Sequence, residues 1–493
     1  MWFFAYFCKN YQMVINNVQS LSFSDRNTRC AIRPRWIAIG AVAYVAACAV
    51  MLAVMPNRMY WEGLAALLAM GAVAAGVYSR MSWRSAGGWA VLGVAATAAA
   101  TLISVNWYYF ANVGGTGLDN PGLLYDPARS WRGAIYMAGY HDVEPVDDMF
   151  LGHISVVWAC IKLFGRSVIA PMAVNGTAIL LGGIFTGSLA ARLIPSRQGA
   201  AYAGMWGMIM IFAVAAFLYM SALMTKDALL CCAVPAFARA MVDIRRPKWL
   251  AVAVVAIVTV IWLRTSMASM MLLGVILMTP CLNWRRDSVA IAVVVATIIA
   301  MYVLERSLAM GIAVQDMGQA NIGLMADNHK GSNQDVWLSV INRDGGLHIW
   351  QQLIVFPAGI LVQFLIPFPW DLSAGGHFMG YAATYYRFAF PWYIIGGLIL
   401  YYIAKGWRRS TKPLKFLYLW AAICWLAPAY MLGGTVSRYG TPFAPILVLG
   451  AVYVVLNLRH EKSLRRWMWI FCVLMAAGLT ACYLIMKNYA QNI

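Results

Sequence analysis

The chain has 493 residues, of which 62% are hydrophobic and 11% are charged, and its mean hydropathy is +0.69. Soluble domains carry about a quarter charged residues, so this composition excludes an ordinary soluble protein. The formal net charge of +19 does not indicate nucleic-acid binding, because the Lys and Arg residues cluster in short connections between apolar runs. The sequence predicts an all-α polytopic membrane protein.

The N-terminal segment, residues 1–35, is expected to stay cytoplasmic because Arg26, Arg29, Arg33 and Arg35 precede the first apolar run. After it, apolar runs recur at about the 20 residues that cross a hydrocarbon core as a helix. About 13 transmembrane helices are predicted, at 36–55, 61–79, 89–111, 167–191, 200–223, 227–243, 249–264, 267–282, 287–304, 389–404, 413–432, 441–457 and 466–486. They form one bundle over residues 36–486.

Two further helical stretches, 148–164 and 351–368, are interpreted by the positive-inside rule. If either crossed the membrane, basic connections such as Arg245-Arg246 or Arg408-Arg409 would fall outside. They are therefore predicted to be juxtamembrane or re-entrant helices within two extracytoplasmic loop regions, 112–166 and 305–388. The N-terminus is then inside, and the tail 487–493 is outside.

The acidic residues gather in these two loop regions. Six of the 18 Asp and Glu residues lie between Asn112 and Asp148, and six more lie between Glu305 and Phe388. A carboxylate can accept the proton of an attacking hydroxyl, while Arg or Lys offsets negative charge on a departing phosphate. The pattern favours an enzyme that acts on a lipid-linked phosphate at the outer face.

Asp126, in LLYDPARSW, is the leading candidate for a catalytic base, and Asp119 is the second. The structural alternative is that Asp126 starts a helix, because Pro127 suits the first helical turn.

Two short turns on the same predicted face carry further candidates. Lys226 and Asp227 begin a span, and ionisable residues at membrane depth are functional hypotheses by default. A mutually satisfied pair with Asp227 capping the helix is the alternative. Arg438 and Tyr439 begin another span, where the guanidinium matches a phosphate or extends to water and lipid headgroups.

Metal binding has little support in the spacing. The six histidines form no HExxH pair, which argues against a zinc site. No cofactor is specified, although a divalent cation on the loop carboxylates stays open.

Several of these segments resemble the GT-C superfamily of membrane glycosyltransferases. The resemblance covers residues 100–460 and rests on Tyr125-Asp126 with the Arg-containing helix after it, LFGRS at 163–167, SLAARLI at 188–194, KDALL at 226–230 and SRYGTPFAPILVL at 437–449. The chain departs from the family because two spans precede the one that leads into the first large loop, and because that loop has no early Asp-x-Asp or Asp-Glu pair.

The resemblance implies inverting transfer of a sugar or glycan from a polyprenyl-phosphate or polyprenyl-diphosphate carrier. The acceptor hydroxyl belongs to a glycan or a lipid-linked acceptor of the cell surface. Asp126 is then the base, while Arg129, Lys226 and Arg438 steady the phosphate beside Asp227 and Tyr439. The expected location is the bacterial inner membrane with the site in the periplasm.

Three other functions stay open on the sequence. A polysaccharide polymerase or ligase uses similar donors, and the late loop with Arg306, Arg343 and Arg387 favours it. A polysaccharide transporter or flippase requires charged or broken helices in related halves, which the spans do not show. A structural membrane subunit has the same hydropathy.

Overall fold

The computed structural model describes residues 42–50, 60–112, 125–140, 151–312, 390–427 and 440–491. These residues are helical apart from short turns, and they contain no strand. Helices dominate because a backbone in hydrocarbon must satisfy its own hydrogen bonds. After a helix over 42–50, the α-helices are α3 (Tyr60–Ser79), α4 (Ala86–Asn112), α5 (Tyr125–Met137), α6 (Leu151–Phe164), α7 (Ile169–Leu193), α8 (Ala200–Phe212), α9 (Ala215–Tyr219), α10 (Lys226–Val242), α11 (Pro247–Leu263), α12 (Met267–Met278), α13 (Trp284–Ile312), α18 (Phe390–Tyr401), α19 (Lys412–Leu426), α21 (Ala444–Asn457) and α22 (Lys462–Gln491).

Four of the described helices, α4, α7, α13 and α22, are long and apolar enough to cross a membrane. A fifth candidate is α8 followed by α9 and the short helix η1 (Met220–Ala222), which bend by 72° at their junction. The run 200–223, predicted as one continuous span, is therefore broken. The chain is a helical membrane protein, and the helix predicted at 148–164 is present as α6. The stretch 351–368 lies outside the described residues.

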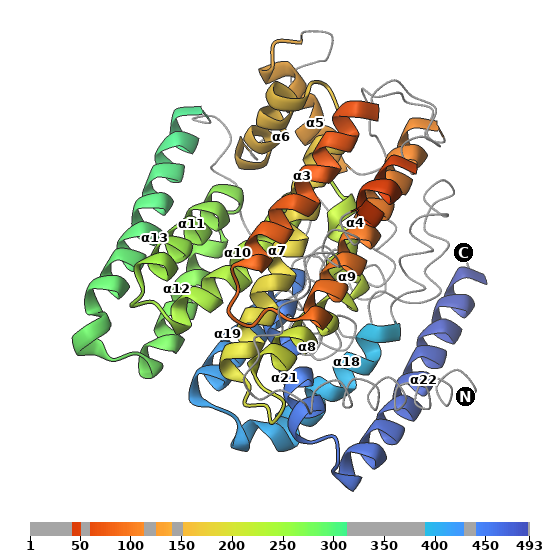
Figure 1. Cartoon of the computed structure of the whole chain (residues 1–493), viewed down its shortest axis with the longest axis vertical. Coiled ribbons are helices and arrows are strands. Elements are labelled where there is room, and N and C mark those ends of the chain that lie inside the picture. Colours follow the sequence, from red (N-terminus) through yellow and green to blue (C-terminus); the bar gives the residue numbers. More distant parts are fainter. Residues whose placement is uncertain are drawn as a thin grey trace.

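Helix α7 occupies the centre of the bundle (Figure 1), where it packs against α3, α4, α8, α10 and α21. Its two sides are buried in different hydrophobic clusters. Ile179 and Leu189 pack with α8, α10 and α21, whereas Leu180 and Ile184 pack with α3, α4 and α6. The helix thus joins the two halves of the core.

Helices α7 and α10 approach each other closely at Gly182. Pro235 has no N–H, so the carbonyl of Cys231, four residues earlier in α10, lacks its usual helical donor. A Cβ at Gly182 would lie 2.5 Å from that carbonyl oxygen, so only glycine permits the contact. This packing fixes α10 against the central helix.

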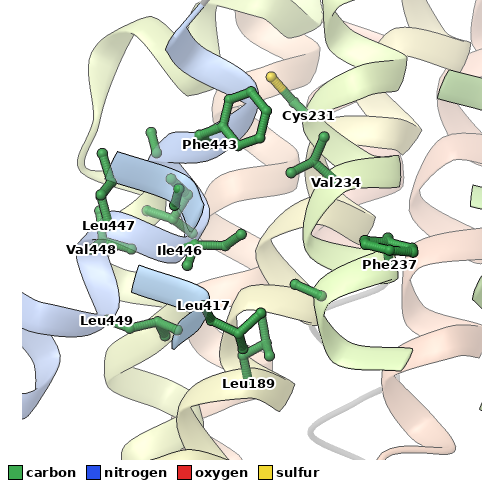
Figure 2. Packing of buried hydrophobic residues seen from close by; sticks show 14 of the residues in the cluster. Leu189, Cys231, Val234, Phe237, Leu417, Phe443, Ile446, Leu447, Val448 and Leu449 are labelled. Carbon is green, nitrogen blue, oxygen red and sulfur yellow. The ribbon is translucent and has the colours of Figure 1, made fainter. Parts of the chain in front are cut away.

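The start of α21 packs on the other side of α10. Figure 2 shows Phe443, in the short helix η7 (Thr441–Phe443), beside Cys231 and Val234 of α10. Phe443 is completely buried, and its ring also lies 5.6 Å, edge on, from that of Trp420. Residues 440–443 therefore lie next to the first turns of α10.

Basic connections meet at the other end of α7 and α10. Asp243, just after α10, accepts ion pairs from Arg192 at 2.9 Å and from Arg239 at 2.8 Å. Arg239 also donates to Ser188 and lies 4.1 Å from the centre of the Trp249 ring. The structure thus brings the α7–α8 and α10–α11 connections to one end of the bundle.

A second ion pair at a connection joins Arg409 to Glu461 at 2.6 Å. Tyr401 donates to the same carboxylate at 2.8 Å. These two hydrogen bonds lower the pKa of Glu461 from its usual 4.5. The turn between α21 and α22 is thereby tied to the end of α18.

Candidate functional site

The chain between α8 and α10 runs through the interior of the protein. After the 72° bend, every residue from Met220 to Thr225 is buried, and Leu223 and Thr225 are extended. Buried carbonyl groups outside a helix need hydrogen-bond donors from elsewhere. The sequence of this segment, MSALMT, supplies none of its own beyond short hydroxyls.

Two buried asparagine side chains provide those donors. The Asn106 amide nitrogen, on α4, donates to the Ala222 carbonyl at 2.5 Å. The Asn175 amide nitrogen, on α7, donates to the carbonyls of Leu223 at 2.5 Å and Thr225 at 3.0 Å. Polar side chains inside transmembrane segments are rare, and these two hold the segment that leads into α10.

Lys226 and Asp227 form the first turn of α10. Thr225 precedes them in extended conformation (φ −126°, ψ 151°) and makes no side-chain capping bond. A carboxylate near a helix N-terminus is stabilised by the helix dipole. Lys226 is only 7% exposed and Asp227 is 0% exposed, so both predicted residues lie inside the protein.

Arg264 completes this charged cluster. It is the residue after α11, and its Nη1 lies 3.8 Å from the Asp227 carboxylate. Its side chain is 19% exposed. The Arg264 guanidinium therefore lies beside the Asp227 carboxylate, and Lys226 is buried in the same helical turn. In a region shielded from solvent, charged groups act on one another more strongly than in water. We refer to Lys226, Asp227 and Arg264 as the charged cluster.

Helices α5 and α6 pack together beyond the ends of α7 and α11, at the top of Figure 1. They are joined by a buried hydrogen bond of 3.0 Å between Ser130 and His153 Nδ1. The indole N–H of Trp262, which lies two residues before Arg264, donates to the hydroxyl of Ser155 on α6 at 3.2 Å. Gly152 allows this contact, since a Cβ there would collide with the Trp262 carbonyl oxygen. The α5–α6 pair thus lies at the end of α11 that carries Arg264.

The predicted site residues fall into three groups. Lys226 and Asp227 are described fully. Asp126 and Arg129 lie in the first turns of α5, consistent with a helix start at Asp126-Pro127, but their side chains are outside the described part of the structure. Asp119, Arg438 and Tyr439 lie outside the described residues altogether.

The described chain from Gly440 onward packs against α10, because the η7 helix contacts α10 through Phe443. Helix α6 packs against the end of α11 that carries Arg264. Segments far apart in the sequence, α6 and η7, thus lie against α11 and α10.

Sequence reasoning missed three residues of this site: Asn106, Asn175 and Arg264. Each carried a detectable signal. Both asparagines interrupt apolar helices, and Arg264 stands between two predicted spans at the end expected to share the face of Lys226. Only the fold shows that all three contact the short segment 222–227.

Metal ligands are not grouped in the described ranges, which contain no cluster of three His, Cys, Asp or Glu side chains. Most acidic residues of the two loops lie outside those ranges. A divalent cation on the loop carboxylates therefore stays a prediction.

Comparisons with other proteins do not identify the chain. No protein-family model matches the sequence, and a search of characterised proteins gives no significant match.

Proposed function

We propose that this protein is an integral-membrane glycosyltransferase of the GT-C type. In this proposal about 13 spans place its site on the outer face of the bacterial inner membrane. It moves a sugar or glycan from a polyprenyl-phosphate carrier to an acceptor hydroxyl during surface-polysaccharide assembly. The observation that carries the proposal is the charged cluster at the start of α10, with two cations of low exposure, one of which, Arg264, ends the helix that packs against α6.

The proposed chemistry uses a base and a cationic leaving-group site. A loop carboxylate, Asp126 with Asp119 as second candidate, takes the proton of the acceptor hydroxyl. The hydroxyl oxygen bonds to the anomeric carbon from the face opposite the phosphate. The bond from that carbon to the phosphate oxygen breaks, and the carrier phosphate keeps the electron pair.

The negative charge that develops on the phosphate needs fixed positive partners. Arg264 lies 3.8 Å from the Asp227 carboxylate, and Lys226 precedes Asp227 in the same buried turn. In this proposal Arg438 and Arg129 have the same role. Preorganised cations in a site of low solvent exposure stabilise such a leaving group without reorganisation. Asp227 then positions Arg264.

The test is the structure of the surface glycan and its lipid-linked precursors in cells that lack the protein. Rescue is attempted with the wild type and with Asp126→Asn. Chains that lack one sugar establish a monosaccharide transferase. Single repeats or accumulated lipid-linked repeats establish a polymerase or ligase, and an unchanged glycan rejects both. Rescue by Asp126→Asn removes Asp126 as the base.

A further inference from the structure

A groove of about 640 Å³ runs along α7 between α3 on one side and α10 with α11 on the other. None of the charged residues discussed above lines it. Its lining comes from α3, α6, α7, α10 and α11 and includes Ala69, Phe164, Ala173, Phe185, Ala233 and Val255.

The groove has a buried floor and exposed rims. Ala173 and Ala178 on α7 and Ala233 on α10 are at most 5% exposed, whereas Val73 on α3 and Val255 on α11 are 47% and 65% exposed. The groove is thus open sideways, between α3 and α11. It follows α7 from residue 170 to residue 185, about 22 Å at 1.5 Å per residue.

The lining offers almost nothing to a polar ligand. Its two hydroxyls are bonded within their own helices, Thr177 to the Ala173 carbonyl at 2.8 Å and Thr259 to the Val255 carbonyl at 2.8 Å. Apart from these, one thiol and the Met70 thioether, the lining is hydrocarbon, with alanine its most frequent residue. A long hydrocarbon chain fits this surface, since burial of its methylene groups is favourable and leaves no polar group unpaired.

Positive charge lies at one end of the groove. Leu229, the first groove residue of α10, is three residues after Lys226, and Ala233 is seven residues after it, so they share a helix face. Arg166 follows Phe164 by two residues at the same end. At the other end, the Arg239 guanidinium is already held by Asp243, Ser188 and the Trp249 ring. The charge pattern suits a lipid whose anionic head lies at the α10 N-terminus.

We infer that this groove binds the hydrocarbon chain of the lipid-phosphate donor, which enters from the membrane between α3 and α11. The inference rests on the proposed function for the identity of that donor. The phosphate reaches Lys226 while its chain extends along α7 toward Phe185. The groove thereby accounts for how a donor dissolved in the bilayer is aligned with a buried charged cluster.

The test is native mass spectrometry of the purified full-length protein in detergent with added polyprenyl phosphate, and with phosphatidylglycerol as competitor. Ala69→Phe and Ala251→Phe fill the exposed rims of the groove, so neither change forces a large residue into the core. Ala292→Phe, at an exposed position of α13 outside the groove, is the matched control.

The wild type and Ala292→Phe should bind one polyprenyl phosphate in preference to phosphatidylglycerol. Each groove variant should bind it about tenfold more weakly. Equal binding by the groove variants, or retention of both lipids in proportion to their concentrations, overturns the inference and leaves only nonspecific membrane lipid.

The two proposals fail separately. If the groove variants lose the lipid but cells without the protein make an unchanged glycan, lipid binding stands and sugar transfer is rejected. If the glycan changes but the groove variants still bind polyprenyl phosphate fully, sugar transfer stands and the groove inference is rejected.

Discussion

At the residue scale, the site depends on side chains that donate hydrogen bonds to buried carbonyl groups where the helix is interrupted before α10. Asn175 alone supplies donors to two carbonyls, and Asn106 supplies a third. A buried acceptor that loses its donor costs about 1–3 kcal/mol. The geometry of the first turn of α10 is therefore determined by residues on α4 and α7.

Asn175→Leu, which keeps the side-chain size but removes the donors, should destabilise the protein by about 1–3 kcal/mol for each carbonyl left without a partner. Thermal unfolding in detergent measures the effect. Thr177→Val on the same helix is the control, because Thr177 bonds only to the Ala173 carbonyl in its own helix. Equal unfolding temperatures for Asn175→Leu and the wild type would contradict this role.

Asp227 and Arg264 should be energetically coupled. Removing one member of a largely buried ion pair leaves the other without its partner, so the two single variants, Asp227→Asn and Arg264→Ala, should each destabilise. The double variant should lose less than their sum, with a coupling of about 0.5–3 kcal/mol. Strictly additive losses of unfolding free energy would show that the ion pair between Asp227 and Arg264, 3.8 Å apart, does not contribute to stability.

At the element scale, the helices follow closely from hydropathy. The run 61–79 forms α3 (Tyr60–Ser79), and 227–243 forms α10 (Lys226–Val242). Hydropathy predicts these helices because an apolar segment in lipid must form its backbone hydrogen bonds within the segment, which a helix does. Hydropathy does not predict the bend in 200–223. The hydrogen-bond donors to the carbonyls after the bend are Asn106 on α4 and Asn175 on α7, and hydropathy depends only on residues that are neighbours in the sequence.

The contact of α6 with α11 should matter more for activity than for folding. Gly152→Ala would push α6 away from the Trp262 carbonyl and weaken the bond from Trp262 to Ser155. Overpacking costs about 1–3 kcal/mol. We expect the glycan product to fall while the protein still accumulates in the membrane.

Gly93→Ala on α4 is the matched control for Gly152→Ala, because a Cβ there meets nothing within 4 Å. It should leave the amount of glycan unchanged. Full product from Gly152→Ala would mean that the α5–α6 pair need not lie at the end of α11.

The contribution of the turn between α21 and α22 to stability should depend on pH, because Glu461 lies in it. Its pKa is lowered by hydrogen bonds from Tyr401 and Arg409, so its charged form stabilises the fold above its usual pKa of 4.5. That contribution disappears as the pH falls through the lowered value. The unfolding temperature of Glu461→Gln should therefore lie below that of the wild type at neutral pH and approach it in acid. A constant difference at all pH values would contradict the assignment.

At the scale of the whole molecule, the fold gathers distant segments at two ends. Arg192, Arg239 and Asp243 meet at one end, while the charged cluster and the α5–α6 pair lie toward the other. Grouping of basic connections was predictable, because charge in short loops is visible in the sequence. The pairing of Asp227 with Arg264 was not, since it depends on how α10 and α11 pack.

The charge distribution bears on the candidate functions. A transporter needs charged or broken helices within related halves, and the bend after α8 with buried Lys226 and Asp227 supplies one such break. The other charges of the described helices lie at connections, as in the ion pairs of Asp243. Together with the apolar groove along α7, this arrangement supports a site that receives a lipid from the side.

The most direct measurement is the amount of mature surface glycan in cells that lack the protein and are complemented with Lys226→Met. Arg408→Met, which removes an exposed cation from a connection away from the charged cluster, is the matched control. Both variants must first be shown to accumulate in the membrane as the wild type does. Arg408→Met should restore the glycan, and Lys226→Met should leave it at the level of cells without the protein. Full restoration by Lys226→Met would contradict it.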